Sequence, residues 1–211
     1  MDAAVAFAGI LGALALGMVS PGPSFIMVAR TSVAVSRGAG MAAAVGMGVG
    51  GLAFGILALL GLEAVLAHAA WLYAALKVGG GLYLIYLAVR LWGGASQPLA
   101  LAPDSARSGR GLATSFALGL ATQLSNPKAA VIYASVFAAL LPSAPPAWLY
   151  IALPPLIFVM ETGWYALVAT AFSSGRPRSL YLAAKAWIDR AAGAVLAALG
   201  IRLIFEAGRT A

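Results

Sequence analysis

Three long stretches of this chain carry no charged side chain. Residues 3–29, 38–62 and 129–160 contain no Asp, Glu, Lys or Arg. Of the 211 residues, 63% are hydrophobic and 9% are charged, whereas a soluble domain usually has about 25% charged residues. Because about 20 consecutive apolar residues cross a bilayer as a helix, these stretches predict an all-α membrane protein. The composition excludes an ordinary soluble enzyme and a disordered chain.

The charge and cysteine content exclude further classes. Although the net charge is +7, the 13 Lys and Arg are scattered between apolar runs, whereas a nucleic-acid binder gathers them on one face. The chain has no cysteine, which rules out disulfides, thiol redox chemistry and thiolate metal sites. The sequence contains no metal-binding cluster and no cofactor motif in a suitable context. The partners we expect are the lipid bilayer and a small solute, without nucleic acid, metal or cofactor.

Apolar runs alternate with turn residues along the whole chain. This pattern predicts a single transmembrane domain over residues 1–211 with six helices, at residues 5–28, 39–61, 70–92, 112–140, 147–172 and 183–206. The longest connection, residues 93–111, is rich in Gly, Ser, Pro and Ala and is predicted to be a linker. We expect the first helix to be retained, because a signal peptide begins with basic residues and none precedes Arg30.

Basic residues cluster at alternate connections, which predicts the orientation in the membrane. The second and fourth connections carry no Lys or Arg, whereas the first, third and fifth are flanked by Arg30, Arg37, Arg90, Arg107, Arg110, Arg176, Arg178, Lys185 and Arg190. Because loops with an excess of Lys and Arg stay in the cytoplasm, we expect both termini outside. Only Arg202 and Arg209, near the C-terminus, oppose this orientation.

The two halves of the chain resemble each other, which predicts an internal duplication. Repeat one covers about residues 5–92 and repeat two about residues 112–206, with Ser20–Pro23 aligned on Ser125–Lys128. Three spans per repeat place the second copy upside down in the membrane. Inverted repeats with broken helices at matching positions are typical of secondary transporters. We therefore predict two inverted three-helix repeats whose first and fourth helices are broken.

A proline motif interrupts the first span. Pro21 and Pro23 lack amide donors, and Gly22 between them adds backbone freedom. In hydrocarbon such a break persists only where protein or water lines it; a simple end of the span is the alternative. We expect the exposed backbone groups of Pro21, Gly22, Pro23 and Ser24 to contact a substrate.

A second proline motif interrupts the fourth span. Pro127 frees the carbonyl of Gln123, and the exposed groups from Gln123 to Asn126 are expected to bind the same substrate. Lys128 follows at a position near the middle of the membrane, where a charge costs at least about 2.5–3.5 kcal/mol. Lys128 is therefore expected to face the protein interior and to have a partner.

Glu161 is the only acidic residue in the fifth span, at a depth similar to that of Lys128. We predict a Lys128–Glu161 pair, which is either a static internal ion pair or a gate and proton site. Intramembrane ionisable residues are often functional, which favours the second interpretation. Trp164 and Tyr165 follow at mid-span rather than at an interface, so we expect them to line the same site.

Three groups of residues together resemble the LysE/RhtB-type amino-acid exporters. They are Pro21-Gly22-Pro23 followed by Arg37-Gly38 and a glycine-rich span, then Asn126-Pro127-Lys128, and finally Glu161 with Trp164-Tyr165 and Trp187-Ile188-Asp189-Arg190. The likeness extends over about residues 10–205. It implies export of amino acids or close derivatives from the cytoplasm across the inner membrane, driven by the proton gradient and often carried out by a homodimer.

The chain departs from this family at one position. Such proteins commonly carry a Gly-Asp pair in the second span, where this chain has Gly50-Gly51. In the alignment of the two halves Gly51 falls opposite Glu161, which itself replaces the family's usual aspartate. One of two symmetry-related acids is therefore missing. This departure weakens the case for cationic substrates such as lysine and arginine.

The residues and the resemblance lead to one functional hypothesis. We expect a proton-coupled secondary exporter with a midplane site between the broken helices, where Lys128 supplies positive charge and Glu161 binds an ammonium or carries the proton. The alternative is a passive small-solute channel or a non-transporting membrane partner subunit. An enzyme is disfavoured because the sequence offers no nucleophile–base pair, metal cluster or cofactor motif.

Overall fold

All regular structure in the described part of the chain is helical. The structure is a computed structural model that describes residues 2–68, 70–97, 111–142, 144–173 and 175–208. These residues form α1 (Ala3–Val19), α2 (Pro23–Ala34), α3 (Arg37–His68), α4 (Ala70–Gly94), α5 (Leu112–Leu124), α6 (Pro127–Leu140), α7 (Ala147–Phe172) and α8 (Gly175–Ala207). Most of the predicted linker, with Arg107 and Arg110, and also Arg209, lies outside the described residues.

The two breaks occur at the proline motifs, as the sequence predicts. Helices α1 and α2 together correspond to the predicted first span, and they are bent by 54° at their junction. Pro23 is the first residue of α2 and Pro127 the first residue of α6. Proline suits this position because its missing amide would have no helical partner there. Asn126 caps α6, since its side-chain Oδ1 accepts a hydrogen bond of 3.0 Å from the backbone amide of Lys128.

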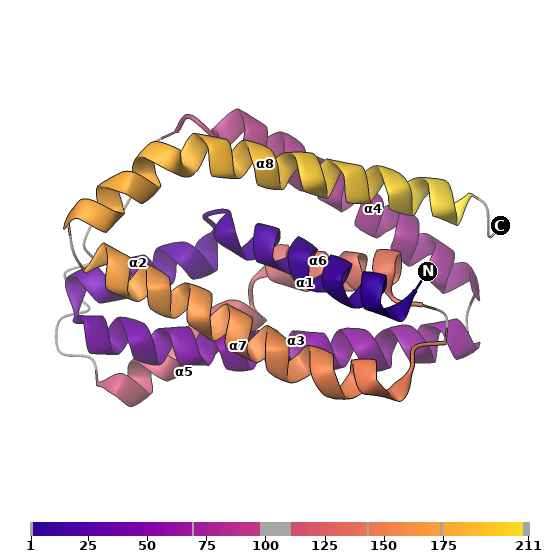
Figure 1. Ribbon diagram of the computed structural model, residues 1–211, viewed down its shortest axis with the longest axis horizontal. Helices are drawn as coiled ribbons and strands as arrows, with labels where there is room; N and C mark the ends of the chain where they lie inside the picture. Colours follow the sequence, from indigo (N-terminus) through magenta and orange to yellow (C-terminus); the bar gives the residue numbers. More distant parts are fainter. Residues whose placement is uncertain (1, 69, 98–110, 143, 174, 209–211) are drawn as a thin grey trace.

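The helices form three layers along the long axis of the molecule (Figure 1). Helices α4 and α8 pack along each other and form one side, while α3, α5 and α7 form the opposite side. The broken pairs α1–α2 and α5–α6 bring their breaks to the middle of the molecule, between these sides. The breaks are therefore enclosed by other helices, which is the condition under which irregular backbone is tolerated at membrane depth.

The chain reverses direction at two opposite ends of the molecule (Figure 1). At one end lie the junctions of α2 with α3 and of α7 with α8, together with the end of α4 and the beginning of α5. At the other end lie both termini, the junction of α6 with α7, and the end of α3 beside the beginning of α4. We call the first end the basic end, because its connections are those flanked by Lys and Arg.

Hydrophobic length identifies only some of these helices as membrane spans. Among the described residues, Arg37–Gly61 of α3 and all of α7 are long and apolar enough to cross a bilayer, and the bent α1–α2 pair is a third candidate. Helices α5 and α6 are apolar but shorter. The structure thus supports a membrane protein with apolar helices, while the count of six spans stays a prediction.

Glycines allow the helices to approach closely. A Cβ atom on Gly46 of α3 would lie 2.2 Å from the backbone oxygen of Phe116 in α5. Gly81 and Gly200 allow an equally close approach of α4 and α8, because a Cβ atom on either glycine would lie within 2.7 Å of the carbonyl oxygen of the other. Small residues at such crossings are typical of helices that pack in membranes.

Apolar side chains fill two clusters that share α3 and α7. One gathers residues of α1, α3, α4, α6, α7 and α8, and includes Ile157; the other gathers residues of α2, α3 and α7, and includes Tyr165. Glu161 lies on α7 between these two residues, one turn from each. The acidic side chain therefore lies at the boundary between the clusters, where the breaks of the other helices also meet.

Candidate functional site

The break between α1 and α2 leaves backbone carbonyls without helical partners, and side chains from other helices supply the missing donors. The Tyr181 hydroxyl of α8 donates to the carbonyl oxygen of Val19 over 3.1 Å. The Lys128 ammonium of α6 donates to the carbonyl oxygen of Ser20, also over 3.1 Å. These bonds satisfy the groups that hydrocarbon could not solvate. They also tie the end of α1 to α6 and α8.

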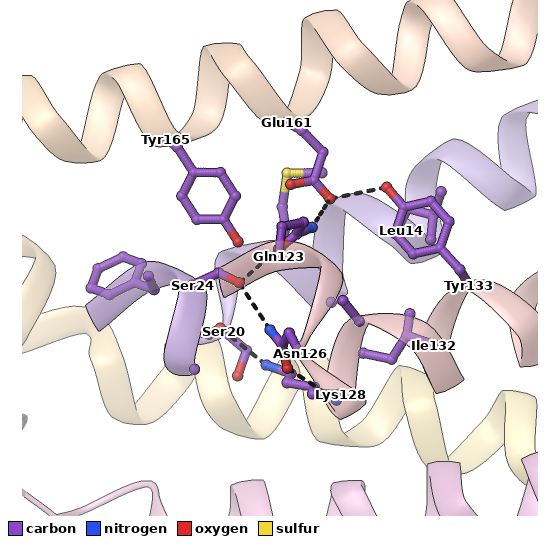
Figure 2. A pocket seen from close by; sticks show the side chains of 15 residues that line it. Leu14, Ser20, Ser24, Gln123, Asn126, Lys128, Ile132, Tyr133, Glu161 and Tyr165 are labelled. Atoms are coloured by element: carbon purple, nitrogen blue, oxygen red, sulfur yellow. Dashed lines mark hydrogen bonds between the residues drawn. The ribbon is translucent and has the colours of Figure 1, made fainter. Parts of the chain in front are cut away.

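Polar side chains join the two breaks directly (Figure 2). The Asn126 side-chain amide donates to the hydroxyl oxygen of Ser24 over 2.9 Å, and the Ser24 hydroxyl donates to Oε1 of Gln123 over 2.6 Å. All three side chains are buried. Ser24, which follows the first proline motif, thus bridges Gln123 and Asn126 beside the second motif.

Glu161 continues this chain of hydrogen bonds. Its Oε1 accepts from the Gln123 side-chain amide over 3.1 Å and from the Tyr133 hydroxyl over 2.9 Å (Figure 2). Its second oxygen, Oε2, is buried and has no hydrogen-bond partner, and the residue is only 3% exposed. A buried carboxylate oxygen without a partner is costly. It is therefore a place for a proton or for a donor from a ligand.

The predicted Lys128–Glu161 pair is not formed. Lys128 bonds to the Ser20 carbonyl, whereas Glu161 bonds to Gln123 and Tyr133, and no ion pair joins the two charged side chains. Ser24, Gln123 and the break residues lie between them (Figure 2). The reason is geometric, because the broken backbone of α1–α2 offers Lys128 a nearer partner than the carboxylate on α7.

A small central cavity lies between these charges. Its volume is about 30 Å³, and its polar lining comes from Ser20, Gly22, Ser24, Gln123, Asn126, Lys128, Tyr133, Glu161 and Tyr165. A cavity needs about 10–15 Å³ to hold one water molecule, so this one has room for very few waters. The site is closed in this conformation.

A larger cavity of about 580 Å³ adjoins the central one, and we call it the vestibule. The two share the residues Gly22, Asn126 and Lys128. Of the remaining predicted site residues, Pro21, Pro23 and Pro127 line the vestibule. Trp164 lines neither cavity and packs against the apolar cluster of α2, α3 and α7.

Comparison with known proteins decides the family. The model of the LysE type translocators matches residues 15–207. The chain belongs to the LysE type translocator family. It is 35% identical to the threonine efflux protein of Escherichia coli K12 over 90% of this chain and 93% of that protein, and 36% identical to that of Salmonella typhimurium over the same shares. It is also 26% identical to the uncharacterized membrane protein YahN of Escherichia coli K12, over 93% of this chain and 87% of that one.

This membership makes the chain a membrane transporter and not an enzyme. The family model covers both breaks and all the lining residues of the central cavity except Leu14, and the threonine efflux relatives match 90% of the chain. No solved structure is significantly similar to the chain.

The side chain of Glu161 occupies the space beside Gly51 on α3. A Cβ atom on Gly51 would lie 2.8 Å from Cγ of Glu161, 3.1 Å from its Cδ and 3.0 Å from the Tyr133 hydroxyl oxygen. Glutamate is one methylene longer than aspartate, and this extra length brings it against α3. Glycine at position 51 and glutamate at position 161 therefore fit each other.

Sequence analysis missed several residues that hold the translocator's site together. Tyr133 bonds to Glu161, and Tyr181 bonds to the end of α1. Asp189 of α8 accepts from the Ser20 hydroxyl over 3.2 Å and forms an ion pair of 2.9 Å with Lys185. The signal for the last pair was present in the sequence, because two opposite charges four residues apart within a hydrophobic helix predict a buried pair.

Proposed function

We propose that this translocator exports a small neutral amino acid of the threonine class from the cytoplasm. The supporting observation is the separation of charge in the central site, with the Lys128 ammonium at one end and the Glu161 carboxylate at the other (Figure 2). A zwitterion has the complementary pattern. Its carboxylate pairs with Lys128, and its ammonium pairs with the open Oε2 of Glu161.

The number of carboxylates favours a neutral substrate over a cationic one. Glu161 is the only acid among the described residues lining the central cavity, and Gly51 stands beside it where the family resemblance implies an aspartate, so a second acid is missing. A lysine or arginine substrate would bring a second positive charge without a partner, which is costly at low dielectric. The names of the threonine efflux relatives point to the same class.

Substrate binding requires the central hydrogen bonds to open, because a cavity of about 30 Å³ is too small for an amino acid. A bound threonine replaces the bonds that it breaks. Its carboxylate takes the place of the Ser20 carbonyl at Lys128, and its hydroxyl bonds to the amide and hydroxyl groups of Gln123 and Ser24. The bonds lost within the protein are thereby regained with the substrate.

The proton is carried by Glu161 in this proposal. A protonated Glu161 no longer attracts the substrate ammonium, so proton arrival from outside releases the amino acid, and proton loss to the cytoplasm restores the site. Six spans in two inverted repeats provide the two access states. In the proposed orientation the basic end of the molecule is cytoplasmic and both termini are outside. The protein acts in the inner membrane, as the homodimer that the family resemblance implies.

Transport in proteoliposomes tests the proposal. Vesicles with a pH gradient are supplied with labelled threonine, serine, lysine and arginine, and accumulation against the concentration gradient is measured. We expect threonine and serine to accumulate, which a channel cannot achieve, whereas lysine and arginine do not. Glu161→Gln should abolish the pH dependence, while Glu206→Gln, the same change at the far end of α8, should keep it. Accumulation by Glu161→Gln that still follows the pH gradient would contradict the role of Glu161.

A further inference from the structure

The vestibule carries more positive charge than its own acids neutralise. Four charged side chains line it, namely Arg90, Lys128, Lys185 and Asp189. Lys185 and Asp189 neutralise each other in their buried ion pair, and Lys185 also donates to carbonyl oxygens at the end of α4. Arg90 and Lys128 form no ion pair with any described carboxylate. The cavity is thus suited to an anion.

The two unneutralised cations lie at different depths. Arg90 is four residues before Gly94, the last residue of α4, which is about 6 Å along the helix axis. Its side chain is exposed, and the end of α4 lies at the basic end of the molecule (Figure 1). Lys128 lines the vestibule and the central cavity alike. A ligand that passes from the basic end to the central site therefore meets Arg90 first and Lys128 last.

The Arg90 guanidinium is held in place at the wall of the vestibule. Its Nη1 donates to the Tyr86 hydroxyl oxygen over 3.0 Å, and its Cζ lies 5.9 Å from the centre of the Tyr86 ring. Two attachments to one residue restrict the long side chain, so less conformational entropy is lost when it binds a ligand. The planar guanidinium keeps further N–H donors for a carboxylate.

We propose that Arg90 is a recruitment site for the substrate's carboxylate, which binds there at the mouth of the vestibule before it reaches Lys128. The site takes the carboxylate of an amino acid, and the proposal rests on the export function proposed above. An amino-acid zwitterion has no net charge, so a cation fixed in the wall captures it by its carboxylate end. That orientation presents the carboxylate to Lys128 and leaves the ammonium for Glu161. Asp189 does not compete for the ammonium, because Lys185 already neutralises it.

Transport kinetics of Arg90→Gln test the recruitment site. With L-threonine supplied at the basic end, we expect KM to rise about tenfold, since the charge-assisted hydrogen bond from the guanidinium to the substrate carboxylate is lost, while kcat changes little. For L-threonine supplied at the opposite end, KM should not change. Arg90→Lys should restore much of the loss. The control is Arg37→Gln, which removes an exposed positive charge at the same end from a residue outside the vestibule.

A competition experiment gives a second readout. L-threoninamide lacks the carboxylate and keeps only the ammonium charge, so its inhibition constant against threonine transport should not rise in Arg90→Gln. An unchanged KM in Arg90→Gln, or a fall in kcat alone, would overturn the recruitment site. Failure of the wild-type protein to transport threonine would instead overturn the proposed function. The two failures are therefore distinguishable within one set of measurements, and Arg90→Lys covers the case in which Arg90→Gln does not fold.

Discussion

Replacement of Gly51 by alanine should disturb the candidate site directly. The added Cβ atom would lie 2.8 Å from Cγ of Glu161 and 3.0 Å from the Tyr133 hydroxyl oxygen, whereas ordinary van der Waals contacts are 3.4–4 Å long. Glu161 must then move away from α3. Because its Oε1 holds hydrogen bonds to both Gln123 and Tyr133, the movement strains or breaks them. We expect both stability and transport to fall.

The expected size of the stability change follows from two opposing terms. Overpacking of a tight interior costs about 1–3 kcal/mol, while replacing glycine by alanine within a helix gains about 1 kcal/mol. The net loss is up to about 2 kcal/mol, which for a chain of this size lowers Tm by up to about 8 °C. Transport should fall more than stability, because the displaced carboxylate is the group proposed to bind the substrate.

Thermal unfolding in detergent and transport in proteoliposomes measure the two effects. Gly61→Ala is the matched control, because Gly61 is on the same helix and a Cβ atom there would have no neighbour within 4 Å. Glu161→Asp shortens the opposing side chain by one methylene, so the double variant Gly51→Ala/Glu161→Asp should be more stable than the two single effects added together. Such coupling between residues in contact is typically about 0.5–3 kcal/mol.

Two results would refute this reasoning. One is a Gly51→Ala protein that unfolds and transports as the wild type does, since the close approach of α3 and α7 at this point would then have no consequence. The other is strict additivity in the double variant. Additivity would mean that the new methyl group and the Glu161 side chain do not compete for the same space.

Two other substitutions test the packing around the site. Asp189→Asn leaves the buried Lys185 ammonium without its counter-ion, so the protein should lose about 3–5 kcal/mol of stability in an unfolding experiment. The double change Asp189→Leu/Lys185→Met should regain most of this stability. An Asp189→Asn protein as stable as the wild type would show that the ion pair does not contribute to stability. Gly46→Ala should lower Tm more than Gly51→Ala, because the new Cβ atom meets the rigid backbone of Phe116 rather than a flexible side chain; equal effects would contradict this difference.

The positions of the helix breaks could be predicted because their cause is local. Pro21, Pro23 and Pro127 lack an amide hydrogen whatever surrounds them, and each stands next to a residue that favours a helix boundary, Gly22 or Asn126. Proline alone does not decide the matter, because Pro154 and Pro155 lie inside the continuous helix α7. The same holds for the long apolar segments, whose composition alone requires burial in lipid or protein. These properties belong to short pieces of chain and need no knowledge of the neighbours.

The partners of the charged side chains could not be predicted in the same way. Counting residues gave Lys128 and Glu161 similar depths, but depth is only one coordinate, and the rotation of each helix decides which side chains meet. Lys128 bonds instead to a backbone carbonyl of Ser20 that is available only because of the break. The bond from Tyr181 to Val19 joins residues 162 positions apart, and no periodic pattern relates them.

The contrast in size between the vestibule and the central cavity determines whether the membrane stays sealed at this protein. The wide compartment of about 580 Å³ ends at one of about 30 Å³, and the step between them consists of hydrogen-bonded side chains and tightly packed helices. A continuous water column through the energised membrane would dissipate the proton-motive force and drain the amino-acid pool. A translocator whose centre is closed, as in this structure, leaves no such water column.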